Sequence, residues 1–189
     1  MTSAIAGNQI LRIPVRQIAR IAGALYVVNT MTSLYAFYGP KTRLAFVSGL
    51  VGTAAYVAIT VLFYFLFKPV SRGLSFIAAL FSIAGTVMGN LSAFHLVPFR
   101  MNFLVFFGFY CALIGYLIIR SFFMPRFVGV LMVSAGLGYL TFLWPPLGNS
   151  LNPFNLILGG LGELTLTVWL LVKGVDQERW IEQANAIVA

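Results

Sequence analysis

A single acidic side chain, Glu163, lies in the middle of an apolar stretch, 154–172, that is long enough to cross a bilayer. No acidic residue precedes it in the chain, and the next one is Asp176. An ionisable side chain at membrane depth costs about 2.5–3.5 kcal/mol on insertion scales. We therefore expect Glu163 to serve a purpose, either between helices or as a binding group for a proton, an ion or a substrate.

Other polar residues recur at a similar depth in the apolar stretches. The depth is counted from the Lys or Arg at one end of each stretch, the end that the charge pattern places in the cytoplasm. Asn29 and two serines lie eight to ten positions from such a cation, and a helix rises about 1.5 Å per residue. Tyr26, Asn29 and Ser33 follow one another at helical spacing, so Asn29 is the strongest expected partner of Glu163. The predicted polar midplane cluster comprises Glu163, Asn29, Ser82, Ser134 and Thr167.

Two roles fit this cluster. In the first, Glu163 is a protonated carboxylic acid that hydrogen-bonds between helices and only holds them together. In the second, Glu163 and Asn29 face a polar cavity and take part in proton or ion transport. The sequence favours the first role, because hydroxyl-bearing residues are common in membrane helices and need no further explanation.

The chain contains one histidine, His95, and one cysteine, Cys111. These counts exclude an intramolecular disulfide and a histidine-rich metal cluster within one chain. His95 closes the third apolar stretch and fits one axial ligand of a haem or a chlorophyll, although an interfacial residue bonded to water or lipid is the plainer interpretation. No cofactor, metal site or catalytic residue is evident, so we expect a non-enzymatic protein.

The composition indicates a membrane protein. Hydrophobic residues make up 60% of the 189 residues and charged residues only 8%, whereas about 25% of a soluble domain is charged. The lipid bilayer is therefore the expected surrounding of most of the chain. The net charge of +8 is spread between apolar segments, which argues against nucleic acid as a partner.

Six apolar stretches are long enough to span a bilayer as helices: 17–38, 44–67, 73–94, 103–119, 127–144 and 154–172. Prolines separate several of them, and the short connections make neighbouring spans antiparallel. The sequence thus predicts an all-α polytopic bundle of six transmembrane helices. We expect a basic N-terminal segment (1–16), the six-span domain (17–173) and a short amphipathic tail (174–189), in which Trp180, Ala184, Ile187 and Val188 share a face.

The positive charges indicate the orientation. If the N-terminus is cytoplasmic, nine Lys and Arg residues lie on the cytoplasmic side and three on the other, in agreement with the positive-inside rule. Both termini are therefore expected in the cytoplasm. The nine are Arg12, Arg16, Arg20, Lys68, Arg72, Arg120, Arg126, Lys173 and Arg179, and the three are Lys41, Arg43 and Arg100.

Small residues at helical spacing predict close helix packing. Gly85 and Gly89 form such a pair on the third stretch, and Gly159 and Gly162 precede Glu163 on the sixth. In lipid, small residues allow neighbouring helices to approach closely.

Five stretches of the chain carry a family resemblance. They are 20–26 (RIAGALY), 68–74 (KPVSRGL), 107–118 (FGFYCALIGYLI), 125–131 (PRFVGVL) and 162–175 (GELTLTVWLLVKGV). Together they resemble the bacterial "domain of unknown function 4386" family of multi-pass membrane proteins. The resemblance covers nearly the whole chain, and it implies a bacterial inner-membrane location and places Glu163 inside a family motif. It implies no substrate and no mechanism.

The leading functional prediction is a scaffold or accessory subunit of a membrane complex, with other membrane subunits or further copies of the chain as partners. It rests on the absence of catalytic groups beside many small-residue faces. One alternative is a small ion- or proton-coupled transporter that uses Glu163. Another is a pigment-, haem- or quinone-binding subunit anchored at His95.

Overall fold

The structure is a computed structural model, and it describes residues 14–40, 42–93 and 102–186. All secondary structure in these residues is helical, which confirms the predicted all-α class. The elements are α1 (Val15–Tyr38), α2 (Arg43–Phe67), α3 (Arg72–Ala93), α4 (Leu104–Arg120), α5 (Arg126–Leu140), the 3-10 turn η2 (Thr141–Leu143), α6 (Pro145–Ser150), α7 (Phe154–Val172) and α8 (Gln177–Asn185).

Local sequence signals account for the helix boundaries. The hydroxyl of Thr42 accepts a hydrogen bond from the Ala45 N–H at 3.3 Å and caps α2. Pro125 and Pro153 stand directly before α5 and α7. Gly174, just after α7, has a φ of 69°, a left-handed conformation that glycine adopts without steric cost. A carboxylate oxygen of Asp176 caps α8 by accepting the Arg179 N–H at 3.2 Å.

The fifth stretch ends differently from the expectation. The predicted span 127–144 is α5 followed by the turn η2, and the proline-rich connection after it contains the short helix α6. Pro145 and Pro146 stand at the first two positions of α6, where proline is tolerated because those N–H groups have no intrahelical acceptor. The proline pair therefore opens a helical turn instead of marking an irregular loop.

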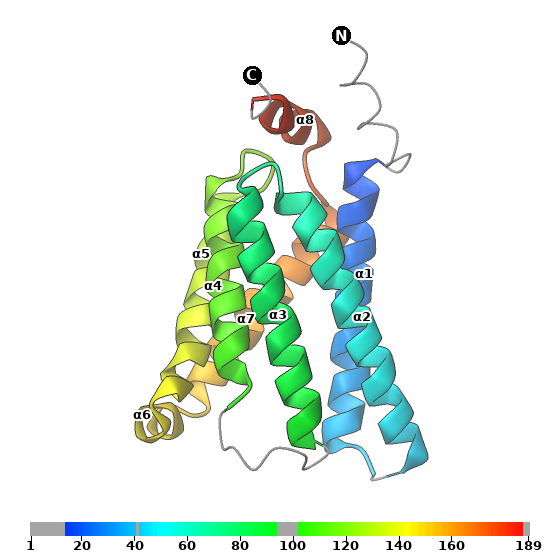
Figure 1. Cartoon of the computed structure of the whole chain (residues 1–189), viewed down its shortest axis with the longest axis vertical. Helices are drawn as coiled ribbons and strands as arrows, with labels where there is room; N and C mark the ends of the chain where they lie inside the picture. The colour runs from blue at the N-terminus through cyan, green and yellow to red at the C-terminus, as the bar shows by residue number, and fades with distance from the viewer. Residues whose placement is uncertain (1–13, 41, 94–101, 187–189) are drawn as a thin grey trace.

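Six long helices form a closed ring. Each helix packs against its neighbour in the chain, and α7 contacts both α5 and α1, which closes the ring. Figure 1 shows α7 crossing obliquely behind the other helices, with α1 beginning and α8 lying at the same end of the bundle. The α1–α2 turn and α6 lie at the opposite end. The ring positions side chains from all six helices around one interior.

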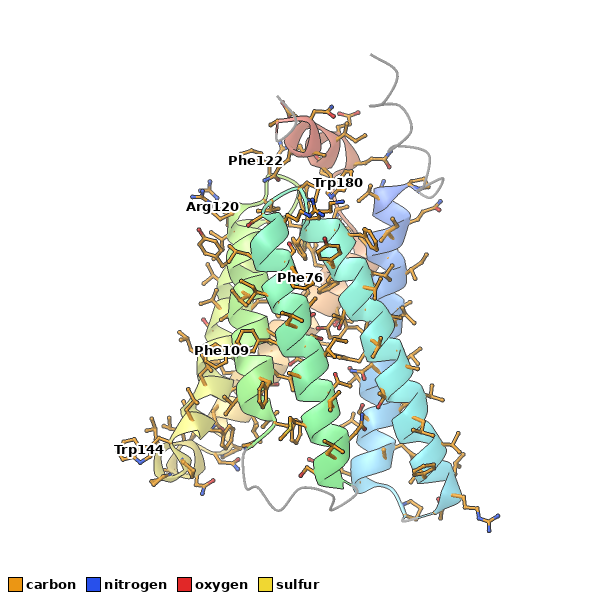
Figure 2. The ribbon with its side chains drawn as sticks, viewed as in Figure 1. Phe76, Phe109, Arg120, Phe122, Trp144 and Trp180 are labelled. Atoms are coloured by element: carbon orange, nitrogen blue, oxygen red, sulfur yellow. The ribbon has the colours of Figure 1, made fainter. Side chains whose placement is uncertain are left out.

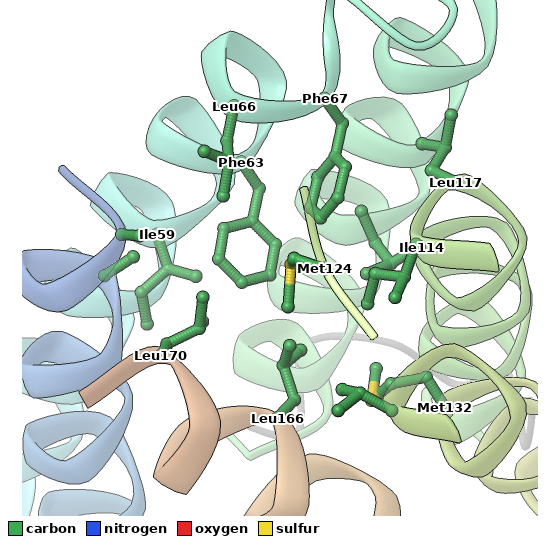
Figure 3. Packing of buried hydrophobic residues seen from close by; sticks show 14 of the residues in the cluster. Ile59, Phe63, Leu66, Phe67, Ile114, Leu117, Met124, Met132, Leu166 and Leu170 are labelled. Atoms are coloured by element: carbon green, nitrogen blue, oxygen red, sulfur yellow. The ribbon is translucent and has the colours of Figure 1, made fainter. Parts of the chain in front are cut away.

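The apolar core fills one half of this interior. Apart from Tyr26 and Tyr110, its largest fully buried side chains come from the C-terminal halves of α2 and α4, the N-terminal half of α5 and the C-terminal half of α7. Figure 3 shows Phe63, Phe67, Ile114, Met132 and Leu166 meeting there. All of them lie toward the end where α1 begins. Van der Waals packing between these side chains stabilises the ring, since lipid removes most of the hydrophobic driving force.

The outer surface of the ring is apolar. Large hydrophobic side chains on α2, α3, α5 and α7 are exposed, including Phe76 and Phe127. Among the described residues, four segments are long and apolar enough to cross a membrane: Arg43–Phe67, Arg72–Ser92, Arg126–Leu143 and Phe154–Val172. The apolar helix α4 has 17 residues and is shorter. The chain is thus a helical membrane protein. Figure 2 places Arg120 and Trp144 at opposite ends of the bundle.

The arginines of α1 contact the end of α7. Arg16 donates to the Lys173 carbonyl and Arg20 to the Val172 carbonyl, each at 3.3 Å. These carbonyls end a helix and lack intrahelical donors, and a cation there also complements the helix dipole. Arg12, the third residue of the predicted arginine stripe, lies outside the described residues.

The amphipathic tail forms α8, which lies across one end of the ring. The indole N–H of Trp180 donates to the Leu66 carbonyl at 2.8 Å, and Figure 2 shows Trp180 pointing into the bundle. The side chain of Gln183 accepts from the Phe122 N–H at 3.1 Å and donates to the Arg120 carbonyl at 3.4 Å. The other predicted residues of this face, Ile187 and Val188, lie outside the described residues.

Candidate functional site

The half of the ring that the apolar core does not fill contains a pocket of about 740 Å³. It extends from the α1–α2 turn, at Ala36 and Thr42, to Glu163 and Tyr139 near the middle of the bundle. All six long helices contribute to its walls. A volume of this size falls within the range of small-molecule sites, about 300–1,000 Å³.

Glu163 stands at the inner end of the pocket. It is the tenth of the 19 residues of α7 and is partly buried. The hydroxyl of Tyr139, from α5, donates a hydrogen bond to one carboxylate oxygen at 3.1 Å. In the part of the chain that the structure describes, the one ion pair joins Arg179 and Asp176 in the tail. The carboxyl group of Glu163 therefore faces the pocket with one hydrogen-bond donor and no cation from the described residues.

Gly159 makes this hydrogen bond possible. A methyl group on Gly159 would overlap the end of the Tyr139 ring and its hydroxyl group. Since Gly159 lies one helical turn before Glu163, its missing side chain leaves the space through which Tyr139 reaches the carboxylate. The Gly159 predicted for helix packing thus accommodates the Tyr139 side chain at the end of the pocket.

Asn29 lines the same pocket from α1. The Ser33 hydroxyl donates to its side-chain carbonyl at 3.4 Å. Gly52 of α2 faces this region, and a methyl group there would lie 2.8 Å from the Thr32 hydroxyl. The structure places Asn29 and Glu163 in the walls of one pocket, without a direct hydrogen bond between these two described residues.

A second amide, which the sequence reasoning missed, lines the pocket from α3. Asn90 of α3 donates to the Thr53 hydroxyl of α2 at 3.2 Å, and Thr53 also approaches the Asn90 carbonyl oxygen at 3.3 Å. Both residues line the pocket. A signal was available, because Asn90 is the one amide side chain between residues 72 and 93, and amides in membrane helices usually form hydrogen bonds.

Aromatic rings form a continuous row from the outer part of the pocket to the centre of the bundle. Phe103 packs edge-on against Phe107 with ring centroids 6.0 Å apart, and Phe107 packs against Tyr56 at 5.2 Å. Tyr56 packs against Tyr110 at 6.1 Å, and the Tyr110 hydroxyl lies 3.5 Å from that of Tyr26. We call these five residues the aromatic row; Phe103, Phe107 and Tyr56 line the pocket.

The remaining residues of the predicted cluster lie elsewhere. Ser82 is fully buried and shares a hydrogen bond with Thr60 at 2.5 Å. Ser134 is partly buried on α5 and is not one of the pocket residues. The Thr167 hydroxyl donates to the Glu163 backbone carbonyl at 2.7 Å, and therefore leaves the carboxylate untouched. His95 lies outside the described residues.

The predicted packing glycines meet side chains or backbone of the same chain. A methyl group on Gly85 would lie 3.1 Å from Phe106, and one on Gly89 would lie 3.5 Å from Phe103. Gly162 lies against α5, where its methyl group would be 2.7 Å from the Leu131 carbonyl. The tightest backbone approach joins α4 and α5 through four glycines, Gly108, Gly115, Gly129 and Gly136.

Comparisons with known proteins agree with the family resemblance. The family described as "Domain of unknown function (DUF4386)" matches residues 100–174, which include Tyr139 and Glu163. An uncharacterized protein of Archaeoglobus fulgidus is 31% identical over 127 residues, which cover 62% of this chain and 76% of that protein. No solved structure matches the chain.

Proposed function

The chain belongs to the domain of unknown function 4386 family, and from the pocket we propose that it is a small proton-coupled carrier whose binding group is Glu163. The observation that carries this proposal is the position of one carboxyl group at the inner end of a 740 Å³ pocket, without a cation from the described residues. Such a group binds either a proton or a positively charged ligand, and each excludes the other.

The pocket supports a carrier better than a channel. It ends at Glu163 and Tyr139. Beyond them, toward the end where α1 begins, the interior is filled by fully buried side chains such as Phe63, Met132 and Leu166. A binding site that is closed on one side and extended toward the other is the arrangement that an alternating-access cycle requires.

We assign six spans with both termini in the cytoplasm. The helices α1 and α4 are counted with the four longer apolar segments because they are members of the same closed ring. The Lys and Arg residues at the two ends favour a cytoplasmic location of the end where α1 begins. With this orientation the pocket extends toward the outer side of a bacterial cytoplasmic membrane, the location that the family resemblance implies.

The accessory-subunit prediction stays a prediction. One of its supports is weaker, since Gly85 and Gly89 pack against phenylalanines of α4 in the same chain and do not form a vacant helix face. The pigment, haem or quinone alternative also stays a prediction, because His95 lies outside the described residues.

Proton flux into proteoliposomes tests the proposal. Because the carboxyl group holds either a proton or a cation, exchange of the two moves no net charge. An outward gradient of an added monovalent cation therefore drives proton entry, and a pH-sensitive dye inside the vesicles reports it. We expect flux with the wild-type protein, loss of flux with Glu163→Gln, and normal flux with Glu182→Gln, which makes the same chemical change on the exposed tail helix. Equal flux with the wild type and Glu163→Gln would refute the proposal, as would a wild-type protein that conducts no protons with or without added cations.

A further inference from the structure

Building on the proposed function, we infer that the ligand is a small organic ammonium ion with an aromatic or apolar body. Its charged nitrogen lies at Glu163, and its body lies along the aromatic row toward the outer part of the pocket. Three features of the pocket lead to this ligand class: the single carboxyl group, the aromatic rings, and the amide and hydroxyl groups that line it.

The single carboxyl group favours a monovalent cation over a divalent metal ion. In the described residues no three His, Cys, Asp or Glu side chains come together as a metal site. Calcium takes six to eight oxygen ligands, commonly with several carboxylates, and magnesium requires a near-octahedral shell. An ammonium ion needs one opposite charge and a few hydrogen-bond acceptors, which this pocket provides.

The aromatic row suits the body of the ligand and its charge. Phe103, Phe107 and Tyr56 line the pocket, and their rings contact one another edge-on. The negative faces of aromatic rings attract organic cations, and this attraction strengthens when water is excluded. The rings also provide apolar contact for the body of an organic ligand. A hydrated inorganic ion has no such apolar body.

The polar walls distinguish an ammonium ion with N–H groups from a quaternary one. Asn29, Thr53 and Asn90 also line the pocket with side chains that carry oxygen atoms, and Tyr139 already occupies one carboxylate oxygen of Glu163. An ammonium group donates up to three hydrogen bonds. It can therefore bond to the free carboxylate oxygen and to a further oxygen at a similar depth, for which Asn29, nine residues from Arg20, is the candidate. A quaternary nitrogen can form none of these bonds.

Calorimetric titration of the full chain in lipid nanodiscs tests the inference. The probes are 2-phenylethylammonium and its neutral counterpart 2-phenylethanol, which share the same body. We expect the ammonium ion to bind at least about tenfold more tightly than the alcohol, a difference of about 1.4 kcal/mol. Equal binding of the two probes would overturn the inference and indicate an apolar pocket for lipid chains. Absence of ammonium binding would overturn it as well.

Two variants locate the binding site. Glu163→Gln removes the charge at similar size, and we expect at least about tenfold weaker ammonium binding with unchanged alcohol binding. Phe107→Leu removes one ring of the aromatic row, and we expect about threefold weaker ammonium binding. The matched control is Phe76→Leu, because Phe76 is 55% exposed on the outer face of α3. An effect of Phe76→Leu equal to that of Phe107→Leu would contradict the assigned site.

The binding and flux measurements together separate this inference from the carrier proposal. Ammonium binding that depends on Glu163, in a protein that moves neither protons nor ammonium ions in vesicles, would support the ligand class and refute the carrier. Proton flux that depends on Glu163, in a protein that does not bind the ammonium probe, would support the carrier and refute the ligand class.

Discussion

The substitution Gly159→Ala tests the geometry at the end of the pocket most sharply. The added methyl group would overlap the ring end and hydroxyl of Tyr139, so either this ring rotates away from Glu163 or α5 and α7 separate. Overpacking a filled interior costs about 1–3 kcal/mol. The loss of a hydrogen bond between membrane helices costs about 0.6 kcal/mol more. The higher helix propensity of alanine offsets about 1 kcal/mol of this cost. We therefore expect the free energy of unfolding to fall by about 0.6–2.6 kcal/mol.

The neighbouring glycine provides the matched control. A methyl group on Gly160 would meet nothing within 4 Å, and alanine has a higher helix propensity than glycine by about 1 kcal/mol. Gly160→Ala is therefore expected to leave the protein as stable as the wild type, or more stable. Tyr139→Phe, which removes only the hydroxyl, is expected to cost about 0.6 kcal/mol and at most about 1.7 kcal/mol.

Reversible unfolding in mixed micelles measures these differences. The protein is titrated with dodecyl sulfate, and tryptophan fluorescence follows the loss of structure. The reasoning predicts that Gly159→Ala unfolds at a clearly lower dodecyl sulfate fraction than Gly160→Ala. Coincident unfolding curves for these two variants would refute the contact between Tyr139 and Gly159, and with it the described position of Tyr139 beside Glu163.

Three further predictions concern the helices around the pocket. Gly136→Val should prevent normal folding, seen as loss of the monodisperse peak in size-exclusion chromatography, because even a methyl group there would lie 2.6 Å from the Ala112 nitrogen of α4; a normal peak would contradict the close α4–α5 approach. Trp180→Phe removes the indole N–H bonded to the Leu66 carbonyl, which should cost about 0.5–1.5 kcal/mol and speed protease cleavage within α8, whereas an unchanged cleavage rate would argue against the docked tail. Cys111 is buried and should not react with a membrane-impermeant maleimide. The single substitutions Trp144→Cys and Arg120→Cys should react with this reagent from opposite sides of the membrane. Labelling of both from the same side would contradict the proposed topology.

Much of the fold could be predicted from the sequence, because apolar length and proline positions carry the information. The predicted stretch 154–172 is α7, and 44–67 differs from α2 by one residue. The helix α6 was not predictable, since a proline pair is compatible with both a loop and the first turn of a helix. The closure of the ring by α7 and α1 was also not predictable, because these helices are far apart in the chain.

The candidate site was only partly predictable, because counting residues along a helix fixes depth but leaves the direction of each side chain open. Asn29 and Ser82 lie at similar counted depths, yet Asn29 faces the pocket and Ser82 bonds to Thr60. Tyr139 was missed for a related reason. It lies 13 residues after Arg126, about 20 Å along a helix, whereas Glu163 lies about 15 Å from Lys173. The oblique course of α7 and the length of the tyrosine side chain bring the two groups together.

Carbodiimide labelling of Glu163 in native membranes is the most direct test of the central claim, that this carboxyl group faces a ligand pocket. A hydrophobic carbodiimide adds to a protonated carboxylic acid to form a stable acylurea, and mass spectrometry identifies the modified peptide. We predict that Glu163 is modified and that 2-phenylethylammonium slows this modification, while labelling of the exposed Glu178 stays unchanged. A Glu163 that stays unmodified, or that reacts at the same rate with and without the ammonium ion, would contradict the account.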